Sequence, residues 1–256
     1  MNQFQKFNQL HQQATPLLLG NIWDLPSAKM FEAAGYQAIG TSSQALALAN
    51  GYDDGEQLPF ERLVAVAKKV VETVNIPFTV DIEGGYDRSV KGIIANIQKL
   101  ADAGVSGINI EDTVAGQTRE LLPADDFAKT ITAIADHLSR TNIKLFLNIR
   151  TDGFLLGLPN ALDETLSRIK LYENTGASGI FTPCITAPDD IKAVVNATVL
   201  PINVMCMPQL PGFDELTQLG VKRLSMGGFL FSKVYEAAGK AATQMFNDKN
   251  FGFLFS

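Results

Sequence analysis

Cysteine and histidine are scarce in this chain of 256 residues, which contains two of each. Cys184 and Cys206 lack the close spacing of a metal-binding motif, and two cysteines do not indicate a disulfide framework, so a reducing location is favoured. His11 and His137 fall in polar stretches with helical character, far from any expected strand end. These scarcities argue against a zinc site and against a histidine-based catalytic triad.

Positive charge is also in deficit, because 21 lysines and arginines stand against 27 acids and give a net charge of −6. A chain of this charge is not expected to use nucleic acid or an anionic membrane as its main partner. No apolar run approaches the roughly 20 residues of a membrane span. Residues 1–6 also lack the apolar core of a signal peptide. We therefore expect a cytoplasmic globular protein.

Short apolar segments alternate with segments of helical periodicity along the chain. Strands are expected at residues 16–21, 37–41, 76–80, 107–110, 144–149, 179–182, 200–205 and 222–226. Helices are expected at residues 2–13, 27–34, 59–73, 92–103, 162–174, 213–219 and 229–246, and others begin near 123 and 188. A long irregular connection is expected between the second strand and the helix that begins near residue 59.

This alternation predicts a parallel sheet covered by helices, and eight strand-helix units predict a (β/α)₈ TIM barrel. No linker or low-complexity run interrupts the units, so we expect one barrel domain over residues 1–256. A doubly wound open sheet is the alternative. That fold is expected to carry a glycine-rich phosphate turn after an early strand, which residues 20–23 do not provide.

The carboxyl ends of barrel strands share one opening, where active sites of this fold lie. Polar residues that the expected strand ends and the connection after the second strand bring there are Thr41, Ser42, Ser43, Asp54, Asp81, Glu83, Glu111, Asp112, Arg150 and Thr182. Several carboxylates at one opening would repel each other unless a cation joined them. Oxygen ligands without histidine or cysteine favour Mg²⁺, with Mn²⁺ as a second choice.

Arg150 is the cation expected at the same opening, and its planar guanidinium suits a substrate carboxylate or phosphonate. Ser42 and Ser43 could hold the other end of a small acid. A purely structural role remains open for two of the acids. Asp112 and Asp152 are also explained if they cap helices or pair with Arg150.

Five stretches of these segments carry a resemblance to a known family. They are residues 40–43 (Gly-Thr-Ser-Ser), 51–56 (Gly-Tyr-Asp-Asp-Gly-Glu), 81–86 (Asp-Ile-Glu-Gly-Gly-Tyr), 110–112 (Ile-Glu-Asp) and 149–152 (Ile-Arg-Thr-Asp). In these pieces and their order, the chain resembles the isocitrate lyase/phosphoenolpyruvate mutase superfamily. The resemblance implies a barrel enzyme that binds a 2-oxo acid, or its enol form, on Mg²⁺ and breaks the C–C or P–C bond beside the carbonyl.

The resemblance also assigns the metal ligands. It makes Asp81 the direct ligand and gives Asp54, Glu83 and Glu111 the waters around the ion. Breaking a bond next to a carbonyl leaves an enolate oxygen with negative charge. A cation at that oxygen stabilises the transition state more than the ground state.

For the substrate, the resemblance implies that Ser42 and Ser43 hold its carboxylate and that Arg150 stabilises the carboxylate and the enolate. We expect Thr41 and Thr182, at their strand ends, to join this substrate-binding set. Arg150, Asp54 and Ser42 are the candidate catalytic residues.

The chain departs from both branches of the superfamily. The lyase branch carries a catalytic cysteine and a histidine in the loop after the fourth strand, and the corresponding residues 113–120 contain neither. The mutase branch has a longer loop there and a histidine near the end of the sixth strand, where this chain has Thr182. Glu83 stands where the family usually has aspartate.

These features favour a Mg²⁺-dependent C–C lyase or decarboxylase with an oxaloacetate-like substrate. An enzyme acting on a P–C bond, such as a phosphoenolpyruvate mutase or phosphonopyruvate hydrolase, is the first alternative, and a non-catalytic 2-oxo-acid-binding barrel is the second. The resemblance further implies a homotetramer, or else a homodimer, in which the last helix is exchanged between subunits. The apolar segment 251–255 agrees with such an assembly.

Overall fold

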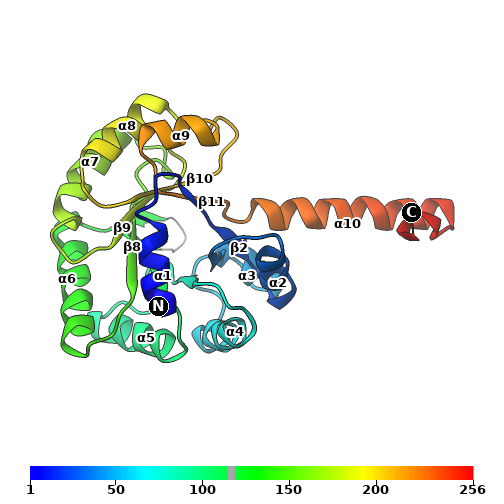
Figure 1. Cartoon of the computed structure of the whole chain (residues 1–256), viewed down its shortest axis with the longest axis horizontal. Coiled ribbons are helices and arrows are strands. Elements are labelled where there is room, and N and C mark those ends of the chain that lie inside the picture. The colour runs from blue at the N-terminus through cyan, green and yellow to red at the C-terminus, as the bar shows by residue number, and fades with distance from the viewer. Residues whose placement is uncertain (115–118, 256) are drawn as a thin grey trace.

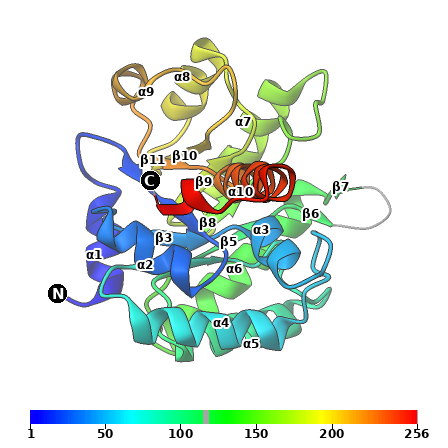
Figure 2. The same cartoon turned by 90° about the vertical axis from the view of Figure 1, so that its right-hand side faces the viewer.

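A computed structural model describes residues 1–114 and 119–255. Its main sheet is entirely parallel, with the strand order β1-β11-β10-β9-β8-β5-β4-β3-β2. The strands are β1 (Leu17–Leu18), β2 (Gly20–Ile22), β3 (Ile39–Thr41), β4 (Phe78–Asp81), β5 (Gly107–Glu111), β8 (Phe146–Arg150), β9 (Gly179–Thr182), β10 (Ile202–Met205) and β11 (Arg223–Ser225). Figures 1 and 2 show helices around this sheet.

The sheet closes through its first strand, which is split at Leu19. β1 pairs with β11, whereas β2 pairs with β3, so consecutive pieces of one segment join the two ends of the sheet. The nine strands therefore form an eight-stranded barrel, in which β1 and β2 are two pieces of the first barrel strand. The predicted (β/α)₈ barrel is confirmed, although the first strand was expected to be continuous.

Amphipathic helices cover the outside of the barrel because each presents one apolar face to the buried strands. They are α2 (Leu25–Ala33), α4 (Phe60–Thr73), α5 (Val90–Asp102), α6 (Ala124–Arg140), α7 (Ala161–Tyr172), α8 (Pro188–Asn196) and α9 (Phe213–Leu219). Helix α2 begins earlier than expected because Asp24, not Ser27, is its N-cap and accepts a hydrogen bond from the Ser27 amide (2.7 Å).

Helix α3 (Ser43–Ala49) corrects the expectation of an irregular connection after β3. Ser42 starts it as the N-cap, since its hydroxyl oxygen accepts a hydrogen bond from the Ala45 amide (3.3 Å). After β5, β6 (Thr113–Val114) and β7 (Glu120–Leu121) form a short antiparallel pair. The cysteine-free loop named above includes residues 115–118, which lie outside the described part of the chain.

The amino end of the barrel is closed by α1 (Gln3–Leu10). Phe7 of this helix packs edge-on against Phe146 of β8, and the His11 ring stacks on the same Phe146 at 4.2 Å between centroids. Above this plug the barrel interior is polar: Asn148 donates hydrogen bonds to Asn109 (2.9 Å) and Asn203 (3.1 Å). The chemistry is thus left to the opposite, carboxyl end.

The last helix, α10 (Phe229–Asp248), runs away from the barrel (Figure 1) and buries none of its residues. A 3₁₀ turn, η1 (Gly252–Phe255), follows it. Among the described helices, none is long and apolar enough to cross a membrane.

Candidate active site

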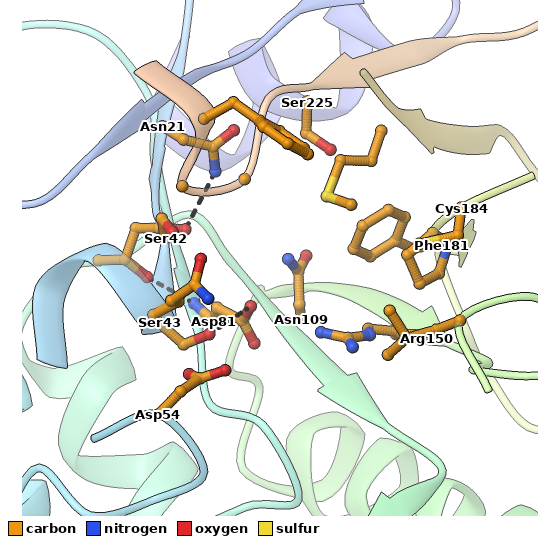
Figure 3. A pocket seen from close by; sticks show the side chains of 18 of the residues that line it. Asn21, Ser42, Ser43, Asp54, Asp81, Asn109, Arg150, Phe181, Cys184 and Ser225 are labelled. Atoms are coloured by element: carbon orange, nitrogen blue, oxygen red, sulfur yellow. Dashed lines mark hydrogen bonds between the residues drawn. The ribbon is translucent and has the colours of Figure 1, made fainter. Parts of the chain in front are cut away.

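A cavity of about 540 Å³ opens at the carboxyl ends of the barrel strands (Figure 3). We call it the central cavity. Six of the residues predicted for the site line it: Thr41, Ser42, Ser43, Asp54, Asp81 and Arg150. Its other walls are formed by Asn21, Gln44, Asn109, Arg119, Leu155, Leu156, Phe181, Pro183, Cys184, Met205, Met207, Ser225, Gly227, Gly228, Phe229 and Ser232.

One side of the central cavity is acidic and is organised around Asp81, the last residue of β4. The Asp81 amide donates a hydrogen bond to the Thr41 hydroxyl oxygen (2.8 Å), which ties the end of β4 to the end of β3. One Asp81 carboxylate oxygen accepts from the Glu83 amide (3.1 Å), and the other accepts from the Ser43 hydroxyl (3.4 Å). Burial raises the pKa of Asp81, and the nearby Asp54 acts in the same direction, while Arg150 opposes both.

Glu83 lies behind this acidic side rather than on the cavity wall. Its two carboxylate oxygens both accept from the Glu56 amide at 3.0 Å, and its side chain is almost fully buried. Burial, with smaller contributions from Asp81 and Asp54, raises the pKa of Glu83 to about 8. Glu83 therefore holds the segment that carries Asp54 and Glu56 against the end of β4.

The opposite side of the central cavity is organised around Arg150, the last residue of β8. Its Nε and Nη2 donate to the two carboxylate oxygens of Asp152 at 2.6 and 3.0 Å. Its Nη1 lies 2.9 Å from Oε2 of Glu111 on the neighbouring β5. Burial favours the neutral form of Arg150, but these two carboxylates hold its pKa above the ordinary value.

Glu111 is buried beneath Arg150 and does not line the cavity. Burial raises the pKa of Glu111 to about 7, and the Arg150 charge counteracts this rise. Its Oε1 accepts from the Thr113 hydroxyl (2.9 Å), whereas Oε2 lies beside Arg150 Nη1 (2.9 Å) and has no other partner within the described residues. An acceptor of this kind can take a hydrogen bond from a water molecule.

Arg119 is a second guanidinium on this side, and the sequence analysis did not identify it. Its Nη1 contacts Glu111 Oε1, and it lies 3.1 Å from both the Thr113 hydroxyl oxygen and Asp152 Oδ2. Burial lowers the pKa of Arg119, but Glu111, Asp152 and Asp54 together outweigh this and the net shift is upward. The available signal was a cation in the loop directly after an acidic strand end.

Thr182 differs from its expected place. Its neighbour Phe181 lines the central cavity, and side chains alternate between the two faces of a strand, so Thr182 points the other way. It is fully buried, and its hydroxyl has no hydrogen-bond partner within the described part of the chain. Instead, Phe181 places its ring 5.8 Å from the guanidinium carbon of Arg150.

Asp112 and Asp152, for which a purely structural role was left open, have different partners. Asp152 pairs with Arg150, as that explanation anticipated. Asp112 does not pair with Arg150; its Oδ2 instead accepts from Arg168 Nη1 and from the Tyr172 hydroxyl, each at 3.0 Å. Its Oδ1 accepts from the Asp152 amide (3.1 Å). Asp112 therefore helps to position Asp152, which in turn pairs with Arg150.

The acidic side suits a hard cation held mainly through water. Within the described residues, no group of three or more histidine, cysteine, aspartate or glutamate side chains could enclose a metal ion directly. Asp81 is a strand-end carboxylate that faces the cavity, Asp54 also lines the cavity, and Glu111 lies deeper in the wall, where Arg150 pairs with its Oε2. One direct carboxylate with waters completing the shell is the usual arrangement for Mg²⁺.

Comparisons with known proteins identify the family of the chain. The family model described as phosphoenolpyruvate phosphomutase matches residues 7–246. The chain is 33% identical to an uncharacterized protein of Mycobacterium tuberculosis (strain H37Rv), across 92% of this chain and 87% of that protein. It is 30% identical to oxaloacetate decarboxylase of Bradyrhizobium sp. (strain BTAi1), across 80% of this chain and 70% of the relative.

A solved structure from Burkholderia cenocepacia J2315, described provisionally as a phosphonomutase, superposes with a TM-score of 0.89 and is 34% identical. The match covers 94% of this chain and 99% of that one. The fold, the family model and the relatives thus agree. The chain belongs to the phosphoenolpyruvate phosphomutase family and is an enzyme of the isocitrate lyase/phosphoenolpyruvate mutase superfamily, a lyase or mutase.

Proposed function

We propose that this enzyme is a Mg²⁺-dependent lyase that decarboxylates an oxaloacetate-like 2-oxo acid through an enolate. The observation that carries the proposal is the separation of charge in the central cavity, with acidic side chains on one side and a guanidinium on the other. Asp81 and Asp54 lie on one side and Arg150 lies on the other, with Asn109 between them (Figure 3). This division suits a metal ion at one end of a small acid and a guanidinium at the other.

The relatives support the choice of reaction. Bradyrhizobium proteins that are 27% and 30% identical to this chain bear the name oxaloacetate decarboxylase. The lining agrees with a small acid as substrate. Leu155, Leu156 and Phe181 form an apolar wall on the side of the cavity where Arg150 lies. Apolar side chains next to a guanidinium lower the local dielectric constant and strengthen its electrostatic contacts with a bound acid.

In this proposal, Asp81 would hold Mg²⁺ directly and Asp54 and Glu111 would orient waters around it, while Glu83 would keep the segment that carries Asp54 in place through the Glu56 amide. The bound cation would stabilise negative charge as it develops on the carbonyl oxygen. Ser42 and Ser43 hold the carboxylate next to the carbonyl. The C–C bond to the second carboxyl group breaks, its electron pair forms the enolate, and carbon dioxide leaves. Arg150, fixed by Glu111 and Asp152, stabilises the anion without reorienting.

The direct test is to incubate the enzyme and Mg²⁺ with oxaloacetate or with phosphonopyruvate and to follow pyruvate. We expect pyruvate from oxaloacetate. Asp81→Ala should abolish both turnover and Mg²⁺ binding measured by calorimetry. Asp136→Ala is the matched control, because Asp136 is an exposed acid on the outer helix α6. An Asp81→Ala enzyme with normal activity would refute the metal assignment.

Action on a P–C bond is the second candidate. The family description and the provisional name of the Burkholderia protein favour it. Two arginines on one wall would also suit a phosphonate. Pyruvate from phosphonopyruvate alone would select this candidate, and pyruvate from neither acid would remove support from both reactions.

We also propose that the enzyme assembles as a homotetramer, with a homodimer as the alternative, by exchanging α10. The helix leaves the barrel, and it and the following segment expose large apolar side chains. Examples are Phe246 at 73% and Phe255 at 87% exposure. Such a surface is usually covered by another chain. Light scattering that gave a monomer would contradict this assembly.

A further inference from the structure

The two guanidiniums of the central cavity contact the same pair of acids in different ways. Arg150 contacts Glu111 and Asp152 through Nε, Nη1 and Nη2, so every nitrogen of its fork faces a carboxylate. Arg119 reaches the same two acids through Nη1 alone, within the described part of the chain. Arg150 is therefore held by the protein, while the other edge of the Arg119 fork lies outside this network.

Arg119 is also more accessible than its partners. Its side chain is 22% exposed, against 12% for Arg150 and at most 1% for Glu111 and Asp152. Both arginines line the central cavity. A fork in a cavity with one edge outside the contacts of the described residues is the arrangement that can bind a carboxylate through two parallel hydrogen bonds.

The backbone near Arg119 is anchored in a way that suits this task. The next residue, Glu120, pairs with Val114, and Leu121 pairs with Thr113, in the short antiparallel β6-β7 pair. The Thr113 hydroxyl also contacts both Glu111 and Asp152 (2.9 and 2.8 Å). The acids, the threonine and the strand pair together hold Nη1 of Arg119 at a fixed point of the wall.

We infer that Arg119 is a specificity-determining residue, which binds a second, distal anionic group of the substrate. This inference rests on the proposed function, in which the first carboxylate lies at the Ser42, Ser43 and metal end. A substrate that spans the divided cavity then carries one anion at each end. The enzyme is expected to select dianionic 2-oxo acids over monoanionic ones of the same shape.

Two inert ligands test this selection without turnover. Malate and its 4-amide share the 2-hydroxy acid group and differ only in the charge of the distal group. Calorimetry of the full chain with Mg²⁺ should show malate binding roughly 10 to 100 times more tightly than the amide. Arg119→Met should remove most of that preference by weakening malate alone, and Arg119→Lys should retain part of it.

Arg62→Met provides the control, because Arg62 is an exposed arginine on the outer helix α4. Circular dichroism of each variant reports whether the barrel is intact. Equal binding of the two ligands by the unaltered enzyme, or a preference that survives in a folded Arg119→Met variant, would overturn the inference but leave the proposed reaction standing. No binding of either ligand together with no pyruvate from oxaloacetate would overturn both.

Discussion

Both ends of the barrel bury ionisable side chains, but they treat the charges differently. At the carboxyl end, Arg150 keeps its charge because Glu111 and Asp152 lie within 3 Å of its nitrogens. At the amino end, burial lowers the pKa of His11 to about 3 and that of Arg223 to about 9. Counterions keep Arg150 charged at one end, whereas burial at the other end keeps His11 neutral and leaves Arg223 charged at neutral pH but with a lowered pKa.

The amino end is built for packing. Arg223 is 1% exposed and lies 5.7 Å from the Phe7 ring, and its Nε and Nη1 have no hydrogen-bond partner in the described part of the chain. His11 Nδ1 donates to the Phe7 carbonyl oxygen (2.8 Å), which fixes the neutral ring against Phe146. Barrel enzymes commonly separate stability and chemistry between the two ends in this way.

The largest test of this comparison is Arg150→Met. It leaves Glu111 and Asp152 with one arginine between them, and we expect a loss of about 3–5 kcal/mol in the free energy of unfolding. The rate of pyruvate formation should fall roughly 10²–10³-fold because the developing anion loses a fixed cation. Denaturant titration and initial rates measure the two effects. Unchanged stability would show that these ions are not held by each other.

Mg²⁺ should stabilise the folded protein by binding at the carboxyl end of the barrel. If Asp81 binds the ion in the folded state alone, raising Mg²⁺ to 100 times its dissociation constant should add about 2.7 kcal/mol to the free energy of unfolding. Asp81→Asn should not respond. Thermal unfolding with and without chelator provides the measurement. An equal Mg²⁺ response in both proteins would place the ion elsewhere.

Arg223→Met probes the amino end. The substitution removes a buried charge without an ion-pair partner among the described residues, so we expect unchanged stability or a gain of up to about 2 kcal/mol. The rate of pyruvate formation should stay within roughly threefold, since Arg223 does not line the central cavity and touches its wall through a hydrogen bond from Nη2 to Asn109 Oδ1 (3.3 Å). A large destabilisation, measured by denaturant titration, would mean that the amino end also depends on a charged guanidinium for its stability.

His11 should give the smallest effect, and it should depend on pH. Its pKa is lower in the folded than in the unfolded protein, so its contribution to stability is present above pH 6.5 and is lost as pH falls toward 3. At pH 5.5 the loss should be about 1.4 kcal/mol. The stability difference between the unaltered protein and His11→Gln should shrink by this amount from pH 7.5. Parallel stability curves would contradict the assignment.

The sequence predicted the barrel well where glycine and apolar runs mark the boundaries. The strand at residues 179–182 and the helix at 213–219 were found with the expected limits. The break at Leu19 was missed, because it reflects which strands lie on either side in the closed sheet. Helix α3 was missed because its start depends on the Ser42 side chain folding back onto the Ala45 amide.

Placement at the site was predictable for residues that end a strand on its inner face, such as Asp81 and Arg150. Thr182 failed this rule by one position, because alternation along β9 gives the cavity to Phe181. Glu83 turned away since its oxygens find the Glu56 amide, 27 residues earlier in the chain. Arg119 could not be placed at all, because its position follows from ion pairs with acids on two other segments.

The first turn of α10 contributes to the wall of the central cavity, while the rest of the helix does not. Phe229 and Ser232, in the first turn, form part of the central cavity wall, and Phe231 packs against Trp23 at 5.5 Å between ring centroids. Farther along, the helix stands clear of the barrel (Figure 1). A neighbouring chain that bound the outer length of α10 would therefore contact the same helix whose first turn lines the central cavity.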